Sequence, residues 1–205
     1  MNRIVDTVAL LQGSNIILDD FAARFEAAGP AEQIAITEAI DRAGQERLWE
    51  LAAGRTVRLD ELVPPGFEPL HPVIFHGKNS LPAVSRFQKR FCRPPPGTPG
   101  CELWGFNFQP LRWLVPLTGP GYFVAYEVEN QLGTIAIDYR RVPTARPADW
   151  PPIVDNSFRL SRFIYHGTVD YLRRISDHLL IGRATRGGTT ELPNWFLLCR
   201  EDVDG

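Results

Sequence analysis

Lysine, cysteine and long apolar runs are all scarce in this chain of 205 residues. Lys78 and Lys89 are the only lysines, against 20 arginines. The odd number of cysteines, 3, is typical of reduced thiols, although Cys92 and Cys101 flank a proline-rich loop and a disulfide between them is the alternative under oxidising conditions. No apolar run approaches the roughly 20 residues that cross a bilayer, so we expect no membrane span. Asp6 interrupts the N-terminal stretch, which argues against a secretory signal and favours a cytoplasmic protein.

Several motifs of well-known chemistry are also missing. The sequence has no GxGxxG, no Walker lysine loop, no GxSxG elbow, no HExxH and no CxxC. Its four histidines lack metal-ligand spacing, so we expect neither a metal nor a cofactor. The net charge of −2 argues against a nucleic-acid partner, because neutralising phosphates requires an excess of basic residues.

The chain does contain two differently built halves. Residues 1–60 carry 6 basic and 10 acidic side chains, whereas the remainder carries 16 and 14. Asp19 and Asp20 are typical of a helix start, Gly29 of its end, and Pro30 of the first position of the next helix, which Gly44 breaks. We therefore expect a helical segment over 1–62, with apolar stripes that bury against the neighbouring domain or in a homodimer.

The second half has the alternation of β-strands. Residues 63–72 read as a proline-punctuated linker, and residues 83–91 fit a short helix or a strand equally well. From Leu103 onward the apolar period is near two, with further strands expected at 158–166, 178–185 and 195–200 and a short helical insertion at 168–175. The fold class is therefore α+β, with N-terminal helices and an antiparallel β-barrel over 63–205.

The densest polar run is His76-Gly77-Lys78-Asn79-Ser80. As a site, it offers an imidazole that titrates near neutrality, an ammonium, an amide and a hydroxyl. As a turn, its Asn and Ser would cap their own backbone, which is common for both residue types.

Basic and aromatic residues supply further candidates. Arg86 and its basic neighbours Lys89, Arg90 and Arg93 would bind an anionic group or form a solvated face. Arg162 and His166 share a face of their expected strand, near Asp170-Tyr171. Trp104 and Tyr126 would line a ligand cavity or belong to an aromatic core.

Parts of the C-terminal half resemble a known family. The residues that carry the resemblance are Leu103-Trp104-Gly105, Phe163-Ile164-Tyr165, the run 170–177 and Leu180-Ile181-Gly182-Arg183. They are similar to uncharacterised bacterial proteins of the GXWXG type, although Glu102 stands where the namesake pattern has glycine. The resemblance implies a lipocalin-like barrel without implying a reaction.

Together these features predict a barrel that encloses a small, largely apolar or amphipathic molecule with an anionic or carbonyl group. It would bind this molecule or catalyse a cofactor-free isomerisation, cyclisation or lyase reaction. In the enzyme, His76 or His166 would move a proton while Lys78 or an arginine stabilised the oxyanion; Asn79, Arg86, Trp104, Tyr126 and Arg162 would contact the ligand. The alternative is an interaction module that dimerises through its N-terminal helices around a packed barrel.

Overall fold

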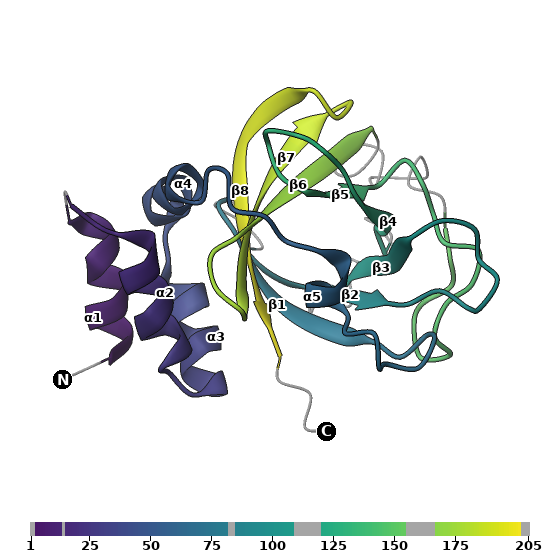
Figure 1. Ribbon diagram of the computed structural model, residues 1–205, viewed down its shortest axis with the longest axis horizontal. Coiled ribbons are helices and arrows are strands. Elements are labelled where there is room, and N and C mark those ends of the chain that lie inside the picture. The colour runs from purple at the N-terminus through teal and green to yellow at the C-terminus, as the bar shows by residue number, and fades with distance from the viewer. Residues whose placement is uncertain (1–2, 14, 82–84, 109–119, 155–166, 202–205) are drawn as a thin grey trace.

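The computed structural model describes residues 3–13, 15–81, 85–108, 120–154 and 167–201. Helices precede strands along the chain (Figure 1). The helical elements are α1 (Arg3–Ala9), the short 3₁₀ helix η1 (Leu10–Gln12), α2 (Leu18–Glu26), α3 (Pro30–Ala39), α4 (Arg42–Leu51) and α5 (Leu59–Leu62). The strands are β1 (Val73–Asn79), β2 (Arg86–Cys92), β3 (Glu102–Phe108), β4 (Tyr122–Glu127), β5 (Ile135–Asp138), β6 (Thr168–Arg174), β7 (Leu179–Arg186) and β8 (Thr190–Arg200).

The eight strands of the described residues form one closed barrel. Each strand pairs antiparallel with the next in sequence, and β8 returns to pair with β1. Closure leaves none of these strands as a free edge, so their backbone groups find partners within the barrel. The α+β fold with an antiparallel, lipocalin-like barrel is therefore confirmed.

Strand alternation separates an inner from an outer face. On β5, Ile135, Ile137 and Tyr139 just beyond it belong to the interior cluster, together with Phe91 and Phe123 of other strands. Outside, two apolar clusters flank the barrel: one lies under the helices, and the other joins β3 and β4 to the segment around Trp150. The barrel wall therefore has a buried face on both sides over much of its circumference.

Helices α1–α4 lie together on one side of the barrel (Figure 1). Their apolar residues, including Phe21, Phe25 and Ile36, are buried in the same cluster as Ile181 and Leu197 of the barrel's outer face. The stripes that were expected to bury against a neighbouring domain or a second subunit thus pack within the chain. A homodimer through these helices stays a prediction.

Helix α5 closes one end of the barrel. Leu59 and Leu62 are buried in the interior cluster. The Leu59 N–H donates to Glu127 Oε1, 3.0 Å away, and the Arg200 guanidinium donates to the Glu61 carbonyl at 2.8 Å. These contacts hold an apolar plug at the end where β1 begins.

Two local expectations differ from the structure, and one open alternative is decided by it. Gly44 lies inside α4, and the chain breaks instead at Ile40 and Asp41, where the Asp41 carboxylate caps the new helix by accepting from the Gly44 N–H. Residues 168–174 form strand β6 rather than a helical insertion. In the ambiguous segment 83–91, residues 86–91 belong to strand β2, which agrees with the strand alternative.

Other expectations agree with the structure or concern residues that it does not describe. Pro30 occupies the first turn of α3, as predicted. Cys92 and Cys101 are free thiols. The strand expected at 158–166 lies outside the described residues. Within the described ranges, no helix is both long and apolar enough to cross a bilayer.

Glu26 fixes α2 to the turn between β6 and β7. Its carboxylate accepts from the His178 backbone N–H at 2.9 Å and lies 2.7 Å from His178 Nδ1. Burial alone would raise the pKa of Glu26, but hydrogen bonds from Ser176 and His178 bring it below its ordinary value. The anionic form therefore stabilises the docking of the helix.

We predict that Glu26→Gln lowers the free energy of unfolding by about 1 kcal/mol at neutral pH, because one charge-assisted contact at a partly buried site is lost. This stabilisation is full above the ordinary pKa of 4.5 and disappears as the pH falls through the lowered value. Urea unfolding across this pH range measures the difference. Glu50→Gln, at an exposed position of α4, is the control, and a difference that persists at low pH would contradict the assignment.

Candidate functional site

A network of four polar side chains crosses the barrel interior. Lys89 Nζ on β2 donates to Asn107 Oδ1 on β3 at 3.1 Å and to Asp170 Oδ2 on β6 at 3.3 Å. It also makes a short hydrogen bond to the Tyr139 hydroxyl, which in turn accepts from Asn107 Nδ2 at 2.9 Å. The Lys89 and Asp170 side chains are only 3% and 8% exposed. A lysine amine and a carboxyl group are thus held together almost out of contact with solvent.

Strand register explains how distant residues meet here. Lys89 and Asn107 are direct partners across the β2–β3 ladder, and Asp170 pairs with Ile137, whose side chain also faces inward. The Tyr139 backbone N–H donates to the Thr168 carbonyl, which continues the β5–β6 pairing past the end of β5. The network therefore spans the barrel from β2 and β3 to β5 and β6.

Burial sets the electrostatics of the network. It lowers the pKa of the Lys89 ammonium, an effect that the Asp170 charge opposes. Burial likewise raises the pKa of Asp170, opposed by Lys89 and by the Tyr139 hydrogen bond. Each shift disfavours the charged form of its own group, so proton transfer between the two groups is easier here than in water.

Four aromatic rings surround the Lys89 nitrogen. Phe87, Phe123, Tyr139 and Phe196, which we call the aromatic collar, have ring centroids between 4.8 and 5.6 Å from Nζ. Rings at such distances attract a cation through their quadrupoles and present apolar surface to an organic ligand.

Glycines in the barrel wall make room for three of these rings. Gly77, Gly105 and Gly182 are the cross-strand partners of Phe87, Phe123 and Phe196, respectively. A Cβ atom on any of the three glycines would lie within 2.1–2.7 Å of atoms of its partner's ring. The rings thus lie against the wall over bare backbone, which leaves the middle of the barrel to the Lys89 amine.

The polar run that the sequence singled out lies mostly on the outer face. His76 Nε2 is 3.0 Å from Glu201 Oε2, and Lys78 Nζ donates to Ser85 Oγ at 3.0 Å. Asn79, at the inner parity of β1, accepts from the Leu81 N–H at 3.0 Å, as in the turn reading of this run. Arg86 forms an ion pair with Glu38 at 3.0 Å and is 65% exposed. None of these contacts joins the Lys89 network.

Trp104 and Tyr126, which were also expected in the site, are separate from this network as well. Trp104 packs in the outer cluster with Trp150, and its indole N–H donates to Glu102 Oε1 at 2.8 Å. The Tyr126 hydroxyl donates to Asp138 Oδ2 at 3.2 Å, again on the outer face. His166 and Arg162 lie outside the described residues.

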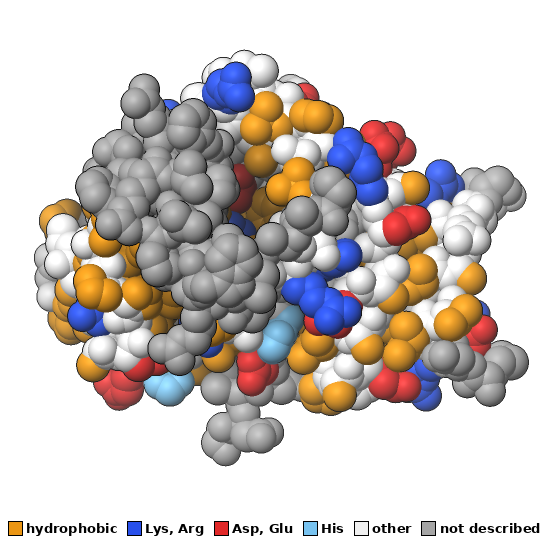
Figure 2. All heavy atoms as spheres, turned by 180° about the vertical axis from the view of Figure 1, so that it is seen from behind, with side chains coloured by type: hydrophobic (Ala, Val, Ile, Leu, Met, Phe, Trp, Pro, Cys, Tyr) orange, Lys and Arg blue, Asp and Glu red, His pale blue; other side chains and the backbone are white. Residues whose placement is uncertain are grey.

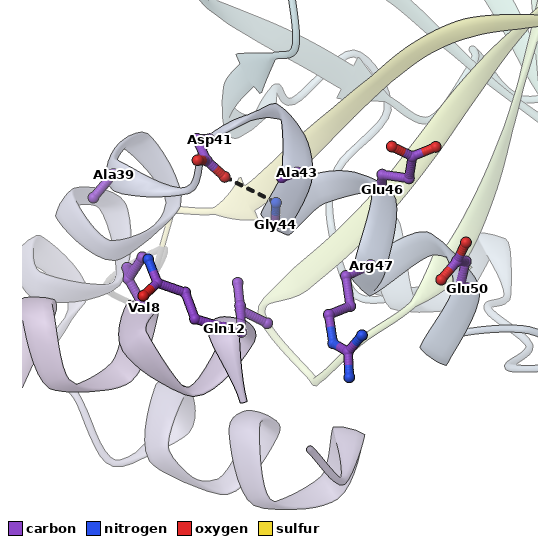
Figure 3. Close-up of a pocket in the computed structure, with 10 residues that line it drawn as sticks. Val8, Gln12, Ala39, Asp41, Ala43, Gly44, Glu46, Arg47 and Glu50 are labelled. Carbon is purple, nitrogen blue, oxygen red and sulfur yellow. Dashed lines mark hydrogen bonds between the residues drawn. The ribbon is translucent and has the colours of Figure 1, made fainter. Parts of the chain in front are cut away.

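The outer surface offers weaker candidates. An open groove of about 580 Å³ lies between α1, α3 and α4 and is lined by Val8, Gln12, Asp41 and residues along one side of α4 (Figure 3). It has no aromatic residue in its lining. Within the described part of the chain, no three His, Cys, Asp or Glu side chains cluster as metal ligands.

Charge on the surface is mixed in sign. On the face in Figure 2, basic and acidic side chains of the described residues are interspersed, and a hollow near the middle has hydrophobic side chains in its wall. Among the described residues, the strongest candidate for a functional site is therefore the Lys89 network inside the barrel. Cys92 adds no nucleophile to it, because burial raises its pKa to about 12 and the thiol stays protonated.

One signal in the sequence pointed to Lys89. If residues 86–92 form a strand, alternation puts Lys89 on the same face as Phe87 and Phe91, opposite Arg86 and Arg90. A lysine flanked by two aromatics on an inward face, in a chain with one other lysine, is distinctive. Its partners Asn107, Tyr139 and Asp170 carried no such signal, because only closure of the barrel brings them together.

Comparison of the chain with family models, with curated proteins and with solved structures finds no match. The geometry of this site is therefore the main evidence for what the protein does.

We predict opposite effects on stability when one partner of the Lys89–Asp170 ion pair is removed and when both partners are replaced. Lys89→Ala leaves Asp170 without its partner and should lower the free energy of unfolding by about 3–5 kcal/mol. The double variant Lys89→Met with Asp170→Leu replaces the pair with apolar groups and should be neutral or stabilising by about 1–4 kcal/mol. Denaturant unfolding separates the two outcomes. A double variant as unstable as Lys89→Ala would contradict this prediction, because the ion pair itself would then stabilise the fold.

We also predict that Gly182→Ala destabilises the protein by about 1–3 kcal/mol, because the new methyl group forces the Phe196 ring off the wall and toward Lys89. Gly66→Ala is the matched control, since a Cβ there meets nothing within 4 Å. Thermal unfolding of the two variants measures the effect. Equal stability of Gly182→Ala and Gly66→Ala would contradict the tight packing of the ring against the wall.

Proposed function

We propose that the barrel binds a small, largely apolar molecule that carries an anionic or carbonyl group, with Lys89 as its polar anchor. The observation that carries the proposal is a lysine buried inside a closed barrel, with its nitrogen surrounded by the aromatic collar. Burying a charge without water is costly and is poor evidence of stabilisation, so a role in recognition gives this residue its best physical explanation.

The two parts of such a ligand match two parts of the site. An apolar body would pack on the rings of Phe87, Phe123 and Phe196, and a carboxylate, sulfonate or carbonyl oxygen would accept from Lys89 Nζ. Asn107 and Tyr139 add a second donor or acceptor close to that oxygen. Apolar walls with a few convergent polar groups are the usual composition of small-molecule sites.

Acid and base catalysis on the bound molecule is the second candidate. It is favoured by the carboxyl of Asp170, which lies beside both a lysine amine and a tyrosine hydroxyl. Asp170 would take a proton from the ligand while Lys89 or Tyr139 stabilised the resulting oxyanion. That arrangement suits a cofactor-free isomerisation, cyclisation or lyase reaction.

Kinship with the GXWXG-type barrel proteins is a further proposal. It is supported by Trp104 and Gly105 at the middle of β3, where the indole packs outside the barrel and the glycine accommodates the Phe123 ring inside. On this proposal Trp104 and Gly105 have a structural role in the barrel wall, and Lys89 recognises the ligand.

Fluorescence titration with anilinonaphthalene sulfonate, an apolar anion, tests the binding proposal. We expect Lys89→Met to weaken its binding about ten- to a hundredfold, which corresponds to the loss of a charge-assisted contact of about 1.5–3 kcal/mol. Lys78→Met is the matched control, because Lys78 lies on the outer face and contacts Ser85. Circular dichroism checks that both variants stay folded.

Equal affinity of the wild type and Lys89→Met would overturn the proposal, as would equal weakening by Lys78→Met. Mass spectrometry under non-denaturing conditions complements the titration by detecting a small molecule that co-purifies with the protein. Its loss in Lys89→Met, with retention in Lys78→Met, is the expected result.

A further inference from the structure

The Lys89 amine has the surroundings that imine chemistry requires. A lysine attacks a carbonyl only through its neutral amine, which a desolvated position favours. The dehydration that follows requires a nearby group that donates a proton, and the Asp170 carboxyl lies 3.3 Å from Nζ. The Tyr139 hydroxyl, hydrogen-bonded to the same nitrogen, is a further proton carrier.

We propose that Lys89 forms a reversible imine with a small apolar aldehyde or ketone inside the barrel. This inference rests on the proposed function and deepens it, since it selects carbonyl compounds from the broader ligand class. Lys89 would then form a covalent bond to the carbonyl compound, either to catalyse its conversion or to capture it. Asp170 would act as the general acid and base.

The step balances without a further reactant. The lone pair of neutral Nζ attacks the carbonyl carbon, the electrons of the C=O π bond move to oxygen, and one proton passes from the nitrogen to that oxygen through the Asp170 carboxyl or the Tyr139 hydroxyl, which gives a neutral carbinolamine. The protonated Asp170 carboxyl donates a proton to the departing hydroxyl, the C–O bond breaks, and water leaves. The nitrogen then returns its remaining proton to the Asp170 carboxylate, leaving a C=N bond in place of the C=O bond.

The surroundings of Lys89 favour an aromatic or short aliphatic carbonyl compound. The collar rings lie 4.8 to 5.6 Å from Nζ and would pack on the body of such a molecule. An imine uses up the Lys89 nitrogen, so a carboxylate on the same ligand would find no second cation in this network and would lie near the Asp170 carboxylate. A neutral carbonyl compound therefore suits the site better than a keto acid.

Because lysine is scarce in this chain, few primary amines compete with Lys89 in a labelling experiment. Besides the terminal α-amino group, the chain offers two primary amines, Lys89 inside the barrel and Lys78 outside it. Incubation with benzaldehyde followed by a hydride reductant converts any imine into a stable benzyl amine. Peptide mapping by mass spectrometry then assigns the label to one of the three positions.

We expect the label to concentrate on Lys89 and to be lost in Lys89→Arg, while Lys78→Arg leaves it unchanged. Asp170→Asn should slow labelling at Lys89 about a hundredfold, as expected for the loss of a general acid and base. The rate in the wild type should also vary with pH, whereas Asp170→Asn should flatten that profile on the acidic side. A purely structural role for Asp170 would leave the shape of the profile unchanged.

The result that overturns the inference is label on Lys78 or the α-amino group with none on Lys89. If anilinonaphthalene sulfonate still binds in a manner that depends on Lys89, the imine fails while the proposed binding function stands. If neither reagent depends on Lys89, both proposals fail.

Discussion

Lys89 and Asp170 face each other in the interior of a closed barrel, where neither charge has bulk water to replace its partner. Much of the interior is arranged around that contact. Asn107 and Tyr139 complete the hydrogen bonding, and the collar rings surround the amine. Removing one partner would leave an uncompensated buried charge, so the pair constrains the register of β2, β3 and β6 together.

The barrel wall accommodates this arrangement through cross-strand pairs of glycine and phenylalanine. Ordinary side chains opposite Phe87, Phe123 and Phe196 would push the rings into the space that Lys89 uses. At the other end of the barrel, α5 closes the interior with Leu59 and Leu62. The interior is thus apolar near α5 and polar at the level of Lys89, which would give the proposed ligand a preferred orientation.

Much of the architecture could be predicted from the sequence, because it depends on local periodicity. Alternation at 122–128 and 135–139 gave the strands and their faces, and Pro30 marked a helix start. Strand β6 lacks a clear alternation, because charged residues occupy both of its faces, and its sequence therefore favours a helical interpretation. Asp170 points inward to Lys89, while Arg173 points outward and its guanidinium lies 3.7 Å from the centroid of the Trp49 ring. The site depends on contacts between residues up to 81 positions apart, which no local pattern encodes.

The most direct test of the account is the titration of the two lysine side chains, observed by NMR after labelling lysine with carbon-13 at Cε. The signal that disappears in Lys89→Met should titrate with a pKa below the ordinary lysine value of 10.5, because burial disfavours the ammonium. It should shift when anilinonaphthalene sulfonate binds. A Lys89 signal that titrates at or above the ordinary value, and that does not respond to the probe, would contradict the central claim.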